Sequence, residues 1–513
     1  MSSVKRYRSL KFSIWGLSAV LLAVMTAPIL FLYAKAVLKL LMESGFAVPA
    51  VNIGLFFRSL LLTLVSTLLC AVMGFIAALF IWGFESNVRS RIIGILVICA
   101  LIPHFIHVHS WIKAVDLVNS AIQDLTPFSP NFTGRGAVIW TTAISYLPFT
   151  AALTYLGFSS VPAQTLDMIK TEDDTYRSFS RIILPYSAPF ILTGMIFVFL
   201  ITINDFAIPS VFGVSVYALE LFALFSAGSD IYSVALAAAP LMILSVVLLA
   251  VFLRLISKGE FPDDFSSGRS PYRRSRSGGA VLVVFAGIPA AAMIVESLKV
   301  REIADVLSQS AGQITYSFLI SVLTAFTVVI PAALYSYLRS RTGGGKVITI
   351  LLSLPFLIPS AILGLSLISY WNTPLLSSLY MSPVMPAIGL TVRFGILAIL
   401  FMSYRFARID REISDSLRLD VSAAKAFFSV VLPMMLKDIA ACLLLVFALA
   451  MGEYGVVLLI TPPGYQMMTI KIYNYIHYGA TEIVFALNMT ILACVLVAGI
   501  LVMRLYKPKG TGR

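Results

Sequence analysis

Residues 179–206 read FSRIILPYSAPFILTGMIFVFLITINDF, and residues 427–454 read FFSVVLPMMLKDIAACLLLVFALAMGEY. Sliding the first stretch by 248 positions places Leu184-Pro185 on Leu432-Pro433 and Asp205 on Glu453. Each stretch contains an apolar run of about 20 residues, which is the length that crosses the hydrocarbon core as a helix. The two stretches therefore predict membrane helices at equivalent places of an internal repeat.

The composition of the whole chain is that of a membrane protein. Hydrophobic residues make up 59% of the 513 residues and charged residues 12%, whereas a soluble domain carries about 25% charged residues. The mean hydropathy is +0.95. Because the apolar runs are long and unbroken, helices are favoured over a barrel. The predicted fold class is an all-α polytopic membrane protein with about twelve transmembrane helices, arranged as two parallel six-helix repeats.

The predicted spans divide the chain into two halves around a polar linker. The domains expected are residues 1–257, a cytoplasmic linker at 258–279, and residues 280–513. The twelve spans are 14–42, 56–82, 92–114, 136–157, 187–212, 231–256, 278–297, 314–338, 347–370, 386–404, 436–460 and 482–503. An even number of spans places both termini on one side of the membrane.

The basic residues indicate which side faces the cytoplasm. Roughly three quarters of the 37 Lys and Arg residues fall in loops on one predicted side, as the positive-inside rule describes. Both termini are therefore predicted to be cytoplasmic. The net charge of +13 lacks an aromatic-interleaved basic face, so nucleic acid is not expected as a partner.

Two long cytoplasmic loops, between spans 4 and 5 and between spans 10 and 11, resemble a known docking motif. Permeases of ABC importers carry the motif E-A-A-x3-G-x9-I-x-L-P. Residues 175–185 (TYRSFSRIILP) and 423–433 (AAKAFFSVVLP) are similar to its end, while Glu172 and Asp420 stand at its glycine position. The ATPase-coupling residues implied by this resemblance are Glu172, Tyr176, Arg177, Phe179, Leu184, Pro185, Asp420, Lys425, Phe427, Leu432 and Pro433.

The resemblance implies a type I ABC importer transmembrane domain and its partners. These are two copies of an ABC ATPase subunit, which bind ATP and Mg, and a periplasmic or lipoprotein substrate-binding protein. The chain itself is expected to hold no cofactor and to be a transport subunit in the bacterial inner (cytoplasmic) membrane rather than an enzyme. Phe179 and Phe427, each six residues before its proline, are predicted to insert their rings into a groove of the ATPase.

Other segments resemble fused iron(III)-type permeases. They are residues 145–149 (SYLPF), 204–209 (NDFAIP), 452–455 (GEYG), 461–464 (TPPG) and 472–479 (IYNYIHYG). Iron(III) or another small cationic solute is therefore the expected cargo, and thiamine, a polyamine or an oxyanion are alternatives. An ion-coupled secondary transporter is the alternative from a different class.

Four polar side chains inside predicted spans are candidates for the translocation path. Asp205 and Glu453 occupy mirrored positions 20 residues after a proline, about 30 Å along a helix. They are expected to face a central cavity near its outer mouth. His104 and His107, one helical turn apart, fit either a transient contact with the cargo or polar packing between helices. Because no set of ligands has a typical spacing, the sequence predicts no metal site.

The sequence offers no ATP site of its own. Residues 343–346 (GGGK) are followed by Val347, where a phosphate-binding loop requires Ser or Thr. ATP chemistry is therefore expected to come from another chain.

Overall fold

The computed structural model describes residues 2–122, 131–170, 175–256, 279, 281, 283–288, 291–292, 295, 303–342, 346–409, 425, 427–477 and 481–506. The elements formed by these residues are helices. The prediction of an all-α polytopic membrane protein is confirmed. The chain forms two compact units, which are described separately below.

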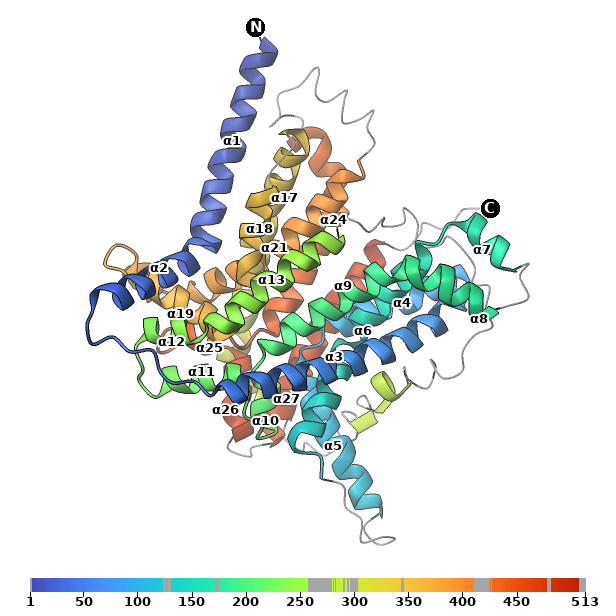
Figure 1. Ribbon diagram of the computed structural model, residues 1–513, viewed down its shortest axis with the longest axis horizontal. Coiled ribbons are helices and arrows are strands. Elements are labelled where there is room, and N and C mark those ends of the chain that lie inside the picture. The colour runs from blue at the N-terminus through green and yellow to red at the C-terminus, as the bar shows by residue number, and fades with distance from the viewer. Residues whose placement is uncertain are drawn as a thin grey trace. The chain divides into compact units, whose positions relative to one another are not determined.

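Unit 2 comprises residues 50–228 and 237–303. At its centre α3, α6 and α9 lie side by side (Figure 1). The helices of this unit are α3 (Ile53–Trp82), α4 (Ser86–Ala100), α5 (His104–Ile122), α6 (Gly134–Ser159), α7 (Ala163–Lys170), α8 (Thr175–Ser178), η1 (Phe179–Ile183), α9 (Leu184–Ile203), α10 (Ala207–Val211), α11 (Tyr217–Ser226), α13 (Ala239–Ile256) and η2 (Val283–Gly287).

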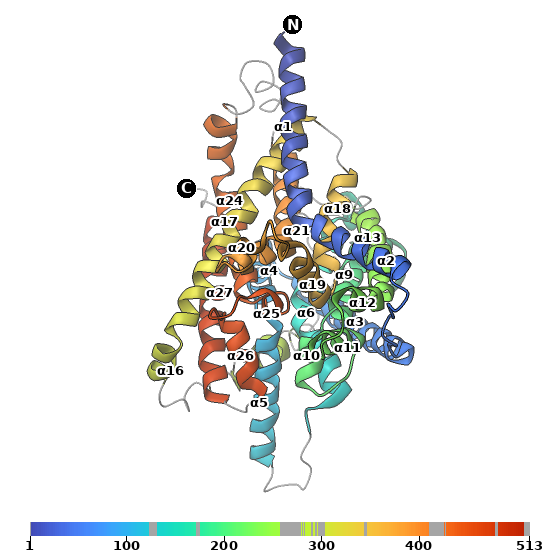
Figure 2. The ribbon, with the colours of Figure 1, turned by 90° about the vertical axis from the view of Figure 1, so that its left-hand side faces the viewer.

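Unit 1 comprises residues 1–49, 229–236 and 304–513. Figure 2 shows α17, α24 and α27 packed next to one another in this unit. Its helices are α1 (Ser2–Met25), α2 (Ala27–Met42), α12 (Ile231–Ala237), α16 (Ile303–Gln309), α17 (Ala311–Thr342), α18 (Lys346–Leu357), α19 (Ser360–Trp371), α20 (Ser377–Tyr380), α21 (Met385–Ala407), η3 (Phe427–Val431), α24 (Leu432–Met451), α25 (Val457–Ile460), α26 (Met468–His477) and α27 (Thr481–Leu505).

Within the described ranges, seven helices are long and apolar enough to cross a membrane, and up to eleven if each of four bent pairs is one span. The seven are α3, α6, η1 with α9, α17, α21, η3 with α24, and α27. The predicted span at 278–297 is described only at residues 279, 281, 283–288, 291–292 and 295. The described part of the chain thus supports at most eleven of the twelve predicted spans.

Four predicted continuous spans are bent pairs of helices. Those predicted at 14–42 and 231–256 bend by 55° and 54°, and the other two bend more sharply. The helix predicted at 92–114 is the pair α4 and α5, bent by 95°, and the one predicted at 347–370 is the pair α18 and α19, bent by 107°. Pro103 and Pro359 lie in the two breaks. Proline lacks an N–H and disfavours helical geometry in the residue before it, so a helix tends to end there.

Two other predicted spans are shorter than expected. The helix predicted at 187–212 ends at Ile203, and the helix predicted at 436–460 ends at Met451. Both end one residue before the Asn204-Asp205 and Gly452-Glu453 pairs. The helix ends at this pair in each case, and a short helix, α10 or α25, follows the break.

The compact units do not follow the order of the chain. Met25, at the end of α1, belongs to a core formed with α17 and α21, and its side chain reaches Gly395. In unit 2, Phe285 and Ala292 join the core of α3 and α6. Each unit therefore includes residues of the first predicted span of the other half. The domain boundaries predicted from the sequence stay a prediction, and all of the predicted linker except Gly279 lies outside the described residues.

Some hydroxyl groups inside the apolar helices are satisfied within their own helix. Ser59 donates to the carbonyl oxygen of Leu55 at 2.8 Å, and Thr324 donates to that of Ile320 at 2.8 Å. A polar group without a partner is costly in hydrocarbon, and a bond to the carbonyl four residues earlier removes that cost. This arrangement lets the long spans carry Ser and Thr at their packed faces.

Candidate coupling and translocation sites

The two segments with the docking-loop resemblance have matching backbone structures. A π-helical turn forms at 179–183 and again at 427–431, and each runs directly into a long helix. Those helices, α9 and α24, begin 248 positions apart at Leu184 and Leu432 and end 248 positions apart at Ile203 and Met451. Proline is the second residue of both helices, which begin directly after the π-helical turn.

The two predicted aromatic knobs pack against their own units. The Phe427 ring is 7% exposed and lies 5.0 Å from the Tyr337 ring, centroid to centroid. The Phe179 ring lies 6.0 Å from Phe75 and 6.3 Å from Phe158. In this arrangement the Phe427 ring fills the core of the chain, and a partner would reach it only if the segment opened. The position six residues before the proline singled out Phe427 in the sequence but gave no sign that this ring is buried.

The neighbouring ring, Phe428, is 64% exposed and meets Phe427 edge-on at 5.2 Å. Glu172 and Asp420 lie outside the described residues, as does the side chain of Tyr176. Leu432 is half-buried. The other predicted coupling residues, Arg177, Leu184, Pro185, Lys425 and Pro433, are exposed. Basic, aliphatic and aromatic groups thus gather at the start of α9 and α24.

A charged cluster that the sequence did not predict lies beside the π-helical turn at 427–431. Asp438, in the second turn of α24, is 4% exposed. Its Oδ1 forms an ion pair with Nε of Arg405 on α21 at 2.7 Å and accepts a hydrogen bond from the hydroxyl of Tyr506, directly after α27. Partial burial and the hydrogen bond to Asp438 raise the pKa of the Tyr506 phenol above its ordinary value. The cluster ties the ends of three helices together a few residues beyond the π-helical turn.

The mirrored acids Asp205 and Glu453 have the same local role. Asp205 Oδ1 accepts from the backbone N–H of Ala207 at 2.8 Å. Glu453 Oε1 accepts from Val456 N–H at 2.9 Å, and its Oε2 accepts from Tyr454 N–H at 3.0 Å. Each carboxylate accepts from backbone N–H groups at the break after a long helix, as an N-cap does. Their predicted role in the translocation path stays a prediction.

The loop around Glu453 is packed too tightly for larger residues. A Cβ at Gly455 would lie 2.3 Å from Ser360 Oγ at the start of α19. A Cβ at Gly364 would lie 2.5 Å from Leu459, and one at Gly389 2.1 Å from Ile460. The short helix α25 is therefore held by close approach to both α19 and α21.

The two units contain hollows of different size. The one beside Asp205 has a volume of about 10 Å³, which is room for about one water molecule. A larger one of about 1010 Å³ in unit 1 is lined by the first turns of α17 and by the loop from Thr461 to Gln466. That loop contains the TPPG segment singled out in the sequence.

The intramembrane histidines belong to helix packing in unit 2. The Tyr146 hydroxyl lies 3.3 Å from Nδ1 of His104. His107 is 4% exposed and stacks on Phe285 at a centroid distance of 5.8 Å. Among the described residues, no group of three or more His, Cys, Asp or Glu side chains could hold a metal ion. A contact of either histidine with a cargo stays a prediction.

Arg393, in the middle of α21, serves the break between α18 and α19. Its Nη1 donates to the carbonyl oxygen of Ile358 at 2.9 Å. Ile358 lies in that break, so its carbonyl has lost the regular helical partner. This charge inside a predicted span is therefore paired with a backbone carbonyl.

Comparison with models of known protein families and with curated protein sequences finds no match for this chain.

Proposed function

We propose that this chain is the permease subunit of an ATP-driven, binding-protein-dependent importer, with two pseudo-symmetric six-span halves. One observation carries the proposal. The unit of π-helical turn, proline, 20-residue helix and capping carboxylate occurs twice, at positions 248 residues apart. A single such segment is an ordinary connector, whereas two matched copies suit a two-fold partner such as an ATPase dimer.

The repeated segment also supplies a mechanical link. Each pore helix is 20 residues long, about 30 Å at 1.5 Å per residue, and joins a coupling segment at one membrane face to a capped break near the other. In the proposed cycle, ATP closure of the ATPase dimer draws the two coupling segments together. The pore helices then tilt as rigid rods, and the cavity opens towards the side that receives the cargo.

The remaining partners follow from this proposal. Two ATPase subunits bind ATP and Mg, and a periplasmic or lipoprotein binding protein delivers the cargo. The chain lies in the bacterial inner membrane with both termini in the cytoplasm, which agrees with the bias of Lys and Arg in its predicted loops. For the cargo we propose iron(III) or another small cationic solute, on the resemblance to iron(III)-type permeases. Thiamine, a polyamine and an oxyanion remain to be compared in uptake assays.

The coupling segment gives the sharpest test. The exposed ring of Phe428 is replaced in Phe428→Ala, and the buried ring beside it in Phe427→Ala. We expect Phe428→Ala to lower co-purification of a Walker-motif ATPase without changing the melting temperature. Phe427→Ala is expected to lower the melting temperature, because deleting a buried phenylalanine costs about 3–5 kcal/mol. Full co-purification and unchanged coupled ATP hydrolysis in Phe428→Ala would contradict the proposed docking.

Uptake into proteoliposomes separates the two transporter classes. Uptake that requires internal ATP and the co-purified ATPase, and that survives an uncoupler, supports the importer. Uptake driven by an ion gradient in the absence of ATPase would establish a secondary transporter instead.

A further inference from the structure

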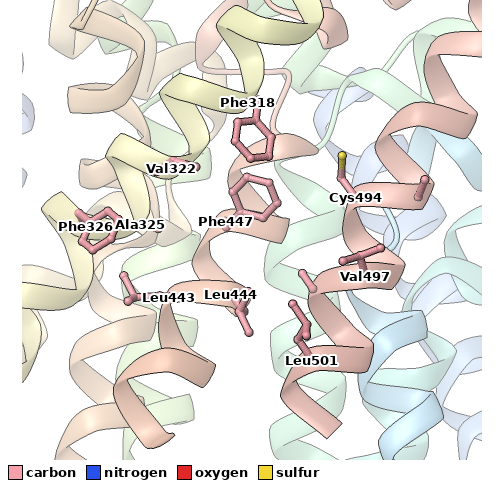
Figure 3. A pocket seen from close by; sticks show the side chains of 12 residues that line it. Phe318, Val322, Ala325, Phe326, Leu443, Leu444, Phe447, Cys494, Val497 and Leu501 are labelled. Carbon is pink, nitrogen blue, oxygen red and sulfur yellow. The ribbon is translucent and has the colours of Figure 1, made fainter. Parts of the chain in front are cut away.

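An apolar groove crosses part of unit 1 between α17, α24 and α27 (Figure 3). Its volume is about 460 Å³, within the roughly 300–1,000 Å³ of ligand pockets. All of its lining side chains are apolar. They include Phe318 and Phe326 of α17, Leu444 and Phe447 of α24, and Val497 and Leu501 of α27. The Phe318 and Phe447 rings meet edge-on at 5.4 Å and form one end of the groove.

The groove lies on a surface that faces hydrocarbon. Its three helices are among the candidate membrane spans, with mean hydropathies of 2.2, 2.2 and 2.5. Phe326 is 48% exposed and Val497 57% exposed, so the groove opens to the outside of the unit. From Ala493 to Leu501 it extends eight residues along α27, about 12 Å. That length is close to the thickness of one leaflet's hydrocarbon, half of about 30 Å.

Basic side chains stand at the other end of the groove. Arg504, in the last turn of α27, follows Val497 by seven residues, and Lys437 of α24 precedes Leu444 by seven residues. Seven residues are nearly two turns, so each basic residue shares a helix face with a groove residue. Both are exposed. Measured along the helix axes, they lie about 4.5 Å beyond Leu501 and about 10 Å beyond Leu444.

We propose that this groove binds one acyl chain of an anionic phospholipid whose phosphate lies against Lys437 and Arg504. An acyl chain is apolar and flexible, and it has the length of one leaflet. The acyl chain moves from the hydrocarbon of the bilayer into an equally apolar groove, so the hydrophobic effect adds little to its binding. Van der Waals contacts with the groove residues supply the binding energy instead. Selectivity among lipids then comes from the two basic groups, which favour an anionic headgroup.

This lipid site differs from the proposed translocation path in its location and in its ligand. The groove lies on the outer face of α24, whose first turns carry the Asp438 cluster. A bound lipid therefore contacts a helix that the proposed mechanism moves.

The test titrates the delipidated full chain with phosphatidylglycerol or phosphatidylcholine and counts retained lipids by native mass spectrometry. Wild-type protein is expected to retain one phosphatidylglycerol molecule at concentrations where phosphatidylcholine is lost. Lys437→Gln with Arg504→Gln should weaken this binding about 30-fold, from two basic contacts. Ala493→Phe, which fills the groove from an exposed position, should remove the bound lipid of either kind.

The control variants are Lys35→Gln and Ile500→Phe. Lys35 is an exposed lysine on α2, and Ile500 is a 45% exposed residue of α27 outside the groove. Neither should change the retained lipid. Equal retention in the wild type and both groove variants would overturn the proposal. A shift in the oligomeric state of Ala493→Phe with unchanged lipid binding would also overturn it, in favour of a second copy as occupant.

Discussion

The cluster of Asp438, Arg405 and Tyr506 predicts an asymmetric response to removal of its charges. Arg405→Gln leaves the Asp438 carboxylate, with a side chain 6% exposed, without a cation. Removing one partner of a buried pair costs about 3 kcal/mol or more. Asp438→Asn leaves the Arg405 guanidinium, and because that side chain is 32% exposed, water replaces part of the lost partner. The expected cost of Asp438→Asn is about 1 kcal/mol.

The double variant, Arg405→Gln with Asp438→Asn, completes a double-mutant cycle. With both charges removed no uncompensated charge is left, so we expect a loss of about 2 kcal/mol, less than the sum of about 4 kcal/mol for the single variants. Since 1 kcal/mol corresponds to roughly 2–4 °C in a unit of this size, Arg405→Gln should lower the melting temperature by roughly 6–12 °C. Asp438→Asn should lower it by roughly 2–4 °C.

A fluorogenic thiol dye measures these transitions in detergent. Cys442 lies one turn after Asp438 and is 1% exposed, so it reacts only when this region opens. All scans use one heating rate, because such unfolding is often irreversible. Arg408→Gln, an exposed position three residues after Arg405, is the matched control and should leave the melting temperature unchanged. Equal effects of the two single variants, or strict additivity in the double variant, would refute the reasoning.

Further predictions concern the break after α24 and a polar residue in α27. Gly455→Ala, whose Cβ would lie 2.3 Å from Ser360 Oγ, should lower the melting temperature, and Ser360→Gly should restore part of the loss; no restoration would place the strain elsewhere. Asp205→Asn with Glu453→Gln retains one cap acceptor at each break, so it should cost about 1 kcal/mol and lower uptake by more than this loss of stability explains; unchanged uptake would remove both acids from the path. Asn488 is 0% exposed and its amide has no hydrogen-bond partner among the described residues, so Asn488→Leu should raise the melting temperature by roughly 2–4 °C, and a fall would reveal a polar role.

Much of the helix pattern could be predicted from the sequence, because apolar length is a strong signal. The helices α3, α6, α17, α21 and α27 lie where their spans were predicted, within a few residues. The Leu-Pro pairs in the sequence also indicated where α9 and α24 begin, since each helix starts at the leucine of its pair. Apolar length and the Leu-Pro pairs are local signals, and they do not depend on how the neighbouring helices are arranged.

The breaks and the partners of buried groups could not be predicted in the same way. An apolar run such as 92–114 has the same composition whether the helix is straight or bent by 95° at Pro103, because proline occurs in straight spans as well. The burial of Phe427 beside an exposed Phe428 depends on Tyr337, ninety residues earlier. Likewise, Asp438 finds Arg405 only through the packing of α21 on α24. Each of these contacts joins residues far apart in the sequence, and the hydrophobic periodicity of a single segment does not predict such contacts.

The three charges that lie at or reach breaks between helices have one physical task in common. A break in a helix frees backbone N–H and C=O groups, and in hydrocarbon each unsatisfied group costs several kcal/mol. Asp205 and Glu453 accept from N–H groups after the breaks that follow α9 and α24, and Arg393 donates to a carbonyl within the break before α19. Charged side chains at these places are therefore explained by the backbone before any cargo is considered. A broken helix stabilised in this way can still serve transport, because a capped break is a point where two rigid segments can change their angle while their hydrogen bonds persist. The variants Asp205→Asn and Glu453→Gln separate capping of the backbone from a role in transport, since they keep the cap acceptor and remove the charge.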